Sequence, residues 1–542
     1  MTQRRGPTPP FQPTKPGHAA SSSTQGRLAE AVRHHQAGRL QEAERLYDEI
    51  LKSSPRHPDT LHLLGLVAYQ KGNHERAESL IGKALEINPD NPAYSNNLGN
   101  VFAAQHRPQE ASELFSRATA QKPDFTEAHN NLGNALQKLD RWEDAVAAYQ
   151  RALASRPRYA EAHSNLGAAL RRLGRLEEAQ ASYERALEYK PDYPAAWNNL
   201  GLVLHERARY EEALPYYDKA LALDPDYAEA HANRAILLLL LGRFGAGWKE
   251  YEWRWKVDGF TTSPRDLGRP LWDGSELRGE TILLHAEQGL GSAIQFVRYV
   301  SRVAQLGGQV MLECPMPLLG LFSSLTEGVP APVKRLIVRG ETLPEFDLQA
   351  PLMSLPRILG TTLDTIPNQV PYLTADPAVA DAWRERMGAT GRPKIGVVWA
   401  GNPRHVNDRN RSMPSSFLSP LLHETDASIF SLQIGAATQD DAILASDRIQ
   451  DLGKEIRDFA DTAAIIANLD LVISVDTAVA HLAGAMGRPT WMLVPFVPEW
   501  RWLLDREDTP WYPTMRLFRQ TAPGDWRELM DRVTEAVAAF ES

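Results

Sequence analysis

A proline recurs every 34 residues through the first half of this chain, at Pro55, Pro89, Pro123, Pro157, Pro191 and Pro225. A glycine keeps the same period at Gly65, Gly99, Gly133, Gly167 and Gly201. Two alanine columns keep it as well, from Ala77 to Ala213 and from Ala84 to Ala220. Because proline ends a helix and small residues let two helices approach closely, each period predicts one pair of packed helices. Pairs that stack in series form a solenoid.

The period and its residue pattern resemble the tetratricopeptide (TPR) repeat, a stacked pair of helices. A degenerate first repeat is expected over residues 24–57, and an altered last one begins near Ala228. The segment Gly247 to Trp255 is dense in aromatic residues. We expect it to pack the last repeat on the next domain; carbohydrate stacking is the alternative.

One asparagine also recurs at a fixed place in the first helix of successive repeats, at Asn97, Asn131, Asn165, Asn199 and Asn233. An Asn amide can donate to a peptide backbone and accept from it at once. Such a ladder resembles the one that lines the TPR groove of the O-linked N-acetylglucosamine transferase, where it holds extended acceptor polypeptide. The resemblance implies that these residues bind an acceptor protein. The alternative is that the amides bond neighbouring repeats or cap loops.

The second half of the chain changes to short apolar segments that alternate with helical patterns. Strands are predicted at residues 281–286 and 309–313, with a helix at 293–306 between them. Another strand is predicted at 394–399, and residues 526–540 have the pattern of an amphipathic helix. This alternation is typical of parallel sheets, and two small α/β lobes are the simplest arrangement.

The apolar run from Leu469 to Val475 predicts a buried parallel strand. Asp476 and Thr477 then turn the chain into a short helix rich in alanine. Ligands bind at the carboxyl ends of strands in open α/β sheets. The start of the helix adds free N–H groups and the positive end of the helix dipole, which suit a phosphate group. This point is therefore the candidate ligand site.

Residues 279–542 resemble the ADP-heptose:lipopolysaccharide heptosyltransferase family of GT-B glycosyltransferases. The matching motifs are Glu287-Gln288-Gly289-Leu290-Gly291, Trp399-Ala400-Gly401-Asn402-Pro403 with Arg411-Ser412, and Val475-Asp476-Thr477-Ala478 followed by His481. The resemblance implies that the first lobe faces the acceptor and that the second binds a nucleotide-sugar. Bacterial proteins that join TPR repeats to such a domain are known as a group, and some are flagellin glycosyltransferases.

By this resemblance the donor diphosphate is bound by Asp476, Thr477, Ala478 and His481. A loop after a predicted strand adds hydrogen-bond donors for the same ligand, among them Asn402, Arg404 and Arg411. Arginine side chains suit this role because a guanidinium group can bind two phosphate oxygens at a time. The alternatives are a structural histidine at position 481 and a solvated basic loop at 402–411.

The general base of the reaction is the point where the chain departs from the family. In the family an Asp follows the glycine-rich loop and is the proposed base, whereas Ser292 stands here. Serine cannot take a proton at neutral pH without help, and an inverting transfer to a hydroxyl usually uses a general base. Glu287 is the first candidate for this catalytic role, and His285 is another. The alternatives are that Glu287 bonds the N–H groups of its own loop, or that the donor phosphate takes the proton.

Composition excludes several other classes. The net charge of −9 over 542 residues argues against a general nucleic-acid binder. A single cysteine, Cys314, permits no internal disulfide and is consistent with a cytoplasmic protein. We expect no integral membrane segment. We also expect no metal, since the one Asp-x-Asp triplet, Asp224 to Asp226, lies in a turn between repeats. No cofactor is expected, because the nucleotide-sugar would be a substrate.

The predicted fold is an α-solenoid of TPR repeats followed by an α/β GT-B fold with two Rossmann-like lobes. The predicted parts are a disordered leader (1–23), the TPR array (24–261), a linker (262–278), the acceptor-side lobe (279–375) and the donor-side lobe (376–542). The expected function is an inverting, metal-independent transfer of a sugar to Ser or Thr hydroxyls of a protein held by the TPR groove. Two alternatives stay open: a heptosyltransferase-like enzyme of surface glycan synthesis, and a TPR scaffold with an inactive GT-B domain.

Overall fold

The computed structural model describes residues 22–260, 265–328, 331–405, 407–435 and 442–541. The chain divides into two compact units, residues 1–203 and 204–542. Of the leader predicted at 1–23, only the last two residues are described, and they begin a helix; the rest lies outside the described residues. The described helices include none that is both long and apolar enough to cross a membrane.

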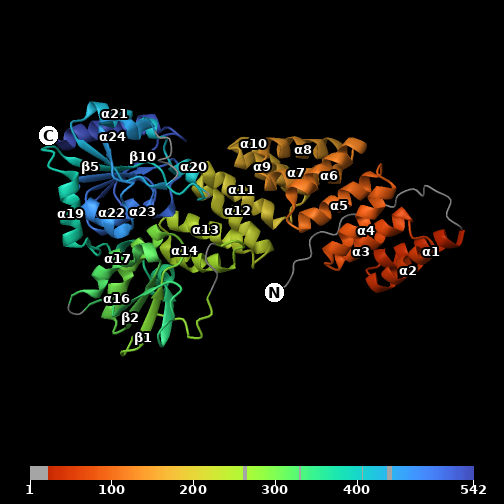
Figure 1. Cartoon of the computed structure of the whole chain (residues 1–542), viewed down its shortest axis with the longest axis horizontal. Helices are drawn as coiled ribbons and strands as arrows, with labels where there is room; N and C mark the ends of the chain where they lie inside the picture. The colour runs from red at the N-terminus through yellow and green to blue at the C-terminus, as the bar shows by residue number, and fades with distance from the viewer. Residues whose placement is uncertain (1–21, 261–264, 329–330, 406, 436–441, 542) are drawn as a thin grey trace. The chain divides into compact units, whose positions relative to one another are not determined.

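The first unit consists of helices that follow one another with short connections (Figure 1). They are α1 (Ser22–Gln36), α2 (Leu40–Ser53), α3 (Pro58–Gln70), α4 (His74–Ile87), α5 (Pro92–Ala104), α6 (Pro108–Gln121), α7 (Thr126–Lys138), α8 (Trp142–Ser155), α9 (Ala160–Arg172), α10 (Leu176–Tyr189) and α11 (Pro194–Glu206), the last of which ends in the second unit. From α1 to α10 each helix packs against the next one. The solenoid predicted from the period is therefore confirmed.

The glycine column sets the distance between the two helices of a repeat. A Cβ added at Gly99 would lie 2.7 Å from the ring of Phe115, and one at Gly133 would lie 2.5 Å from the ring of Tyr149. Both rings are buried. A large side chain of the second helix thus fills the space that the glycine of the first helix leaves open.

The second unit begins with the last helices of the repeat region. These are α12 (Tyr210–Leu223), α13 (Ala228–Leu240) and α14 (Phe244–Tyr251), followed by the 3₁₀ helix η1 (Glu252–Lys256). The ring of Trp248 in α14 is buried and lies edge-on to the rings of Trp500 (5.3 Å between centroids) and Phe296 (6.3 Å). The aromatic segment therefore packs on the α/β region, as the sequence predicts.

A parallel sheet of four strands, in the order β3-β2-β1-β4, is formed by the described residues between 279 and 375. Its strands are β1 (Thr281–His285), β2 (Gln309–Cys314), β3 (Arg335–Val338) and β4 (Leu348–Pro351). Its helices are α15 (Leu290–Phe296), α16 (Val300–Gln305), α17 (Leu319–Phe322) and α18 (Leu355–Ile358). The single helix predicted at 293–306 was wrong, because the 3₁₀ turn η2 (Val297–Tyr299) separates α15 from α16.

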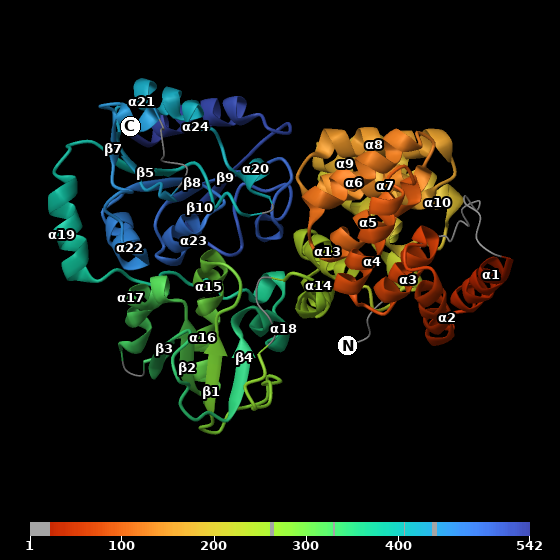
Figure 2. The same ribbon diagram turned by 45° about the vertical axis from the view of Figure 1, so that its right-hand side comes forward.

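A second parallel sheet, with six strands in the described residues, has the order β10-β9-β8-β5-β6-β7. Its strands are β5 (Lys394–Val398), β6 (Ser428–Ser431), β7 (Ile449–Asp451), β8 (Leu471–Val475), β9 (Thr490–Val494) and β10 (Met515–Arg519). Its helices are α19 (Pro377–Met387), α20 (Asp408–Arg411), α21 (Ser419–Glu424), α22 (Phe459–Ala467), α23 (Ala478–Ala485) and α24 (Trp526–Glu541). Figure 2 shows α21 and α24 on one face of this sheet and α22 and α23 on the other.

The core of the second sheet explains why its strands are fixed in place. Alternate residues of the strands, such as Val397 and Ile473, pack with Leu529 and Val533 of α24, and all four are at most 1% exposed. A strand buried on both faces reads as a nearly continuous apolar run, as β8 does in the sequence. The α-solenoid followed by parallel α/β structure is the fold class that the sequence predicts.

Candidate functional site

The candidate site lies where β8 ends. Strand β8 runs between β5 and β9, so the segments that follow these three strands meet at one edge of the sheet. The strand itself is buried, whereas Asp476, Thr477 and Ala478 after it are half-buried. Thr477 has extended backbone at the start of α23, and its hydroxyl is hydrogen-bonded to Ser474 Oγ (3.0 Å). The hydroxyl therefore does not cap the first N–H groups of the helix, which suits them to an anionic ligand.

The glycine-rich loop of the first sheet faces the start of α23. A Cβ added at Gly291 would lie 2.9 Å from His481 Cδ2 and 3.4 Å from Ala478 Cα. Helix α15, which follows this loop, packs against α23. The structure thus brings together the glycine-rich loop and the Asp-Thr turn, two of the three motifs that the sequence singles out.

Arg411 brings the third motif to the same place. Its Nη1 donates to the carbonyl oxygen of Asp476 at 3.0 Å. A Cβ at Gly401 would collide with the guanidinium group of Arg411, so the glycine is what lets this side chain lie there. Asn402 and Arg404 lie on the exposed part of the same loop, where Asn402 Oδ1 accepts from Arg404 N at 3.0 Å.

His481 is buried in α23 and is only 5% exposed. Its Nδ1 lies 2.9 Å from the hydroxyl of Tyr512, its ring stacks on Trp502, and its Nε2 lies 3.8 Å from Asp476 Oδ1. Burial lowers the pKa of His481 well below its usual value, and nearby arginines act in the same direction, so the ring is neutral at pH 7. These contacts hold the start of α23 in place, and a donor-binding role for His481 stays a prediction.

The predicted bases Glu287 and His285 are buried. The Glu287 side chain is 0% exposed, and its Oε1 accepts from Arg254 Nη2 at 2.8 Å. Arg254 comes from η1 and also donates to Ser354 Oγ at 2.9 Å. Burial lowers the pKa of His285 to about 4. This environment favours an anchoring role for Glu287, and a catalytic role for either residue stays a prediction.

Two functional candidates were missed by sequence reasoning, Arg501 and Glu499. Arg501 lies in the 3₁₀ helix η10 (Trp500–Trp502), and its Nη2 donates to Ser292 Oγ at 3.0 Å. Its Nη1 forms an ion pair with Glu499, whose side chain is 29% exposed. Burial raises the pKa of Glu499 to about 7; Arg501 opposes this shift and Asp476 adds to it. The sequence signal that could have found them is their place in the chain. Both residues follow β9, which is paired with β8, so they come to the same sheet edge as Asp476.

The asparagine column bonds neighbouring repeats. Asn131 Nδ2 donates to Asn96 Oδ1 (3.2 Å) and Asn100 Oδ1 (3.1 Å) of the preceding repeat. Asn165 makes the equivalent pair of bonds to Asn130 and Asn134. Asn97 Nδ2 lies 2.8 Å from His62 Nε2. These three amides therefore bond neighbouring repeats, which is the alternative that the sequence left open. All five asparagines of the column, including Asn199 and Asn233, are half-buried.

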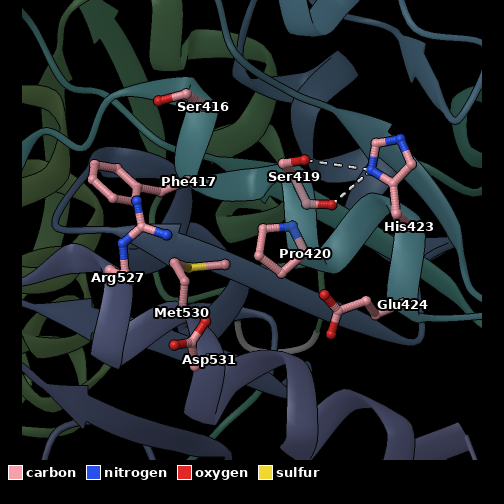
Figure 3. A pocket seen from close by; sticks show the side chains of 9 residues that line it. All are labelled: Ser416, Phe417, Ser419, Pro420, His423, Glu424, Arg527, Met530 and Asp531. Atoms are coloured by element: carbon pink, nitrogen blue, oxygen red, sulfur yellow. Dashed lines mark hydrogen bonds between the residues drawn. The ribbon is translucent and has the colours of Figure 1, made fainter.

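Two described cavities lie elsewhere in the second lobe. One of about 350 Å³ lies between the start of α21 and α24, with Ser419, His423, Arg527 and Asp531 on its walls (Figure 3). Another, of about 690 Å³, opens beside Lys394 at the amino-terminal ends of β5 and β8. That is the sheet edge opposite to Thr477. The first cavity lies between two helices, and its lining includes none of the site residues named above.

Comparison with known proteins supports both halves of this organisation. Tetratricopeptide repeat family models match residues 34–99, 96–136, 124–192, 165–228 and 216–248. The family model for glycosyltransferase family 9 (heptosyltransferase) matches residues 456–493. The chain therefore contains TPR repeats, and the segment from α22 to β9, which carries the Asp476 turn, is similar to that glycosyltransferase family.

Protein FlbA of Caulobacter vibrioides is 30% identical to this chain over 330 residues, which are 56% of this chain and 54% of FlbA. The chain thus spans about half the length of this curated relative. Among solved structures, MamA is 28% identical, with a TM-score of 0.29, over 31% of this chain and 97% of MamA. YrrB, described as a TPR protein with an unusual peptide-binding site, is 24% identical with a TM-score of 0.31, over 34% of this chain and 95% of YrrB.

Proposed function

We propose that this chain is a GT-B glycosyltransferase that moves a sugar from a nucleotide-sugar to Ser or Thr hydroxyls of a protein acceptor. The single observation that carries the proposal is the meeting of Gly291 with Ala478 and His481, at the carboxyl end of a buried parallel strand. Similarity of residues 456–493 to a glycosyltransferase family supports it. In this proposal the acceptor-side lobe is 279–375 and the donor-side lobe is 376–542.

The donor diphosphate would lie at the start of α23. The N–H groups there can donate to phosphate oxygens, and so can the Thr477 hydroxyl if it exchanges its bond to Ser474 Oγ for one to the ligand. The Arg411 guanidinium bonded to Asp476 brings a positive charge. Fixed donors and guanidinium groups can stabilise the charge that develops on a leaving diphosphate, which is the task of a metal ion in other enzymes. We therefore propose a metal-independent, inverting transfer, with Asn402 and Arg404 contacting the outer part of the donor.

The TPR array would bind the acceptor polypeptide along its asparagine column. The amide hydrogens of Asn131 and Asn165 are used between repeats. Their Oδ1 atoms receive no hydrogen bond from any described residue, so they can accept from backbone N–H groups of an extended peptide. Asn97 and Asn199 would belong to the same surface of the first unit, and Asn233, in the second unit, stays a predicted acceptor-binding residue. Flagellin is one acceptor to test.

The decisive experiment supplies the full-length chain with ADP-, UDP-, GDP- and CMP-sugars and with purified flagellin. Transfer is measured as nucleotide release and as a mass increase on Ser or Thr of the acceptor. Thr477→Ala and Arg411→Ala should each lower kcat/KM by about 10- to 100-fold, since each loses a bond to a charged group. Arg386→Ala is the matched control, because Arg386 is an exposed arginine of α19.

Two outcomes would favour the competing functions. Turnover of a donor with a glycan acceptor but with no polypeptide would favour surface glycan synthesis. If the wild-type chain turns over none of the four donor classes, and the two variants keep its cellular function, the chain is a TPR scaffold with an inactive α/β domain.

A further inference from the structure

Glu499 lies beyond β9, at the same sheet edge as Asp476. Its carboxylate accepts from Arg501 N at 2.9 Å and pairs with the Arg501 guanidinium, so two bonds fix its orientation at the start of η10. Strand β9 is paired with β8, which places the residues after the two strands side by side. The charge of Asp476 raises the pKa of Glu499, which is consistent with that proximity.

The same guanidinium group also reaches the first lobe. Arg501 Nη2 donates to Ser292 Oγ at 3.0 Å while Nη1 pairs with Glu499. One guanidinium group therefore bridges the Glu499 carboxylate and the Ser292 hydroxyl, so these two groups lie close together. Ser292 is the first residue after the glycine-rich loop that faces Ala478. We infer that Glu499 is the general base of the transfer, so that the second lobe supplies the carboxylate that position 292 lacks.

Other titratable groups near the helix start fit this role less well. Glu287 is paired with an arginine, as Glu499 is, but its side chain is 0% exposed. His481 is buried and hydrogen-bonded through Nδ1 to Tyr512. Asp476 is next to the proposed phosphate site, and its side chain is 15% exposed, about half as much as that of Glu499. Glu499 thus combines a fixed orientation with access for an acceptor hydroxyl.

The charges that face Glu499 suit it to take and release a proton near neutral pH. Burial raises its pKa to about 7, Arg501 on its own segment opposes the shift, and Asp476 after β8 adds to it. Tyr251, on α14, is close enough for the charge of Glu499 to contribute to the raised pKa of its hydroxyl. A general base works best when its pKa is near the working pH. The carboxylate is the competent form, so activity should rise as the pH increases through about 7.

This role rests on the proposed function, and its chemistry is a single displacement. The oxygen of the acceptor hydroxyl forms a bond to the anomeric carbon of the donor sugar. The bond between that carbon and the phosphate oxygen breaks, and its electron pair leaves with the nucleotide. The hydroxyl proton passes to the Glu499 carboxylate and then to solvent, which restores the base.

The test compares the full-length wild type with Glu499→Gln, using whichever donor of the ADP-, UDP-, GDP- and CMP-sugar panel the wild type turns over. We expect kcat to fall by at least about 100-fold, because general base catalysis contributes that much or more. The KM for the donor should stay within about threefold, since Glu499 does not bind the diphosphate. The wild-type rise in kcat/KM through pH 7 should be absent from the variant.

Glu507→Gln is the matched control and should keep wild-type kinetics, because Glu507 is an exposed glutamate (78%) a few residues beyond η10. If Glu499→Gln does not fold, as judged by circular dichroism, Glu499→Asp keeps the charge and Glu499→Ala allows rescue by added formate. A kcat for Glu499→Gln close to that of the wild type, or loss of the pH dependence in Glu287→Gln instead, overturns the assignment and leaves the transferase proposal standing. No turnover of any donor by the wild type overturns both.

Discussion

At the scale of single residues, Gly401 controls where Arg411 lies. A side chain at position 401 would occupy the space of the guanidinium group that bonds the Asp476 carbonyl. Glycine is therefore needed here for the close approach of a neighbouring side chain and not for an unusual backbone conformation. The two motifs have different parts in this contact. Trp399 to Pro403 contains the glycine that leaves room for a side chain, and Arg411-Ser412 contains the arginine that fills that room.

We expect Gly401→Ala to weaken binding of the nucleoside diphosphate without unfolding the chain. Loss of one charge-assisted hydrogen bond costs about 1.5–3 kcal/mol, which corresponds to a loss of affinity of about tenfold or more. Isothermal titration with the diphosphate of the identified donor measures this change. The control is Gly245→Ala in α14, where an added Cβ meets no atom within 4 Å. Unchanged affinity in Gly401→Ala would show that Arg411 does not contact the ligand.

Residue roles at the site were only partly predictable from the sequence. The Asp476-Thr477 turn and Arg411 were found because each carries a motif, and the structure brings them together. Glu499 and Arg501 carry no motif, and their proximity to Ser292 arises from the pairing of β8 with β9 and from the packing of α15 on α23. The burial of Glu287 depends on Arg254, which comes from a segment before the first strand.

At the scale of elements, the sequence predicted strands better than it predicted breaks in helices. The end of β8 and the start of β1 lie where the apolar runs place them, because a strand buried on both faces has little polar surface in its sequence. The turn η2 was missed because Val297 to Tyr299 keeps a helical pattern. It carries Arg298, which is buried and donates to the carbonyl oxygen of Trp511 at 2.6 Å. That partner is far away in the chain, so local periodicity contains no sign of it.

The asparagine column gives a prediction about how repeats hold together. In Asn165→Asp a carboxylate oxygen replaces the amide nitrogen that donates to Asn130 Oδ1 and Asn134 Oδ1. Three hydrogen-bond acceptors then lie together with no hydrogen between them. We expect the free energy of unfolding to fall by about 1–3 kcal/mol, more than in Asn165→Ala, where water can reach the vacated oxygens. Urea unfolding of the full chain measures both changes.

Asn88→Asp is the control for this substitution, since Asn88 is an exposed residue at the end of α4. It should change the free energy of unfolding by less than about 0.5 kcal/mol. An Asn165→Asp variant as stable as Asn165→Ala would mean that the amide hydrogens are not used between repeats. The column would then be available to a peptide as both donor and acceptor.

At the scale of the whole molecule, the end of the repeat region and the first α/β lobe share a buried polar cluster within the second unit. Arg254 of η1 pairs with Glu287 beside the glycine-rich loop and with Glu252 (2.9 Å). Tyr251 and Gln288 add a hydrogen bond between the same two segments. The glycine-rich loop is thus held from behind by the repeat region while its front faces α23.

Arg254→Met tests that anchoring through its dependence on pH. Burial raises the pKa of Glu287 to about 7 even with Arg254 beside it. A carboxyl group with a raised pKa in the folded state contributes stability that is present at low pH and is lost as the pH rises through the folded pKa. Without the arginine, the folded chain above pH 7 must either protonate Glu287 or bury its charge unpaired. We expect the loss of unfolding free energy to be about 3–5 kcal/mol at pH 8 and clearly smaller at pH 5.

Urea unfolding at the two pH values measures this difference, and Arg386→Met in α19 is the control, since its ion pair with Glu455 is exposed and should contribute little at either pH. A loss that is the same at pH 5 and pH 8 would mean that Arg254 acts by packing alone, because only an electrostatic role depends on the protonation of Glu287. The pH-dependent result would also bear on catalysis. Glu287 and Glu499 are each paired with an arginine, and they differ in exposure, because the side chain of Glu287 is 0% exposed and that of Glu499 is 29% exposed.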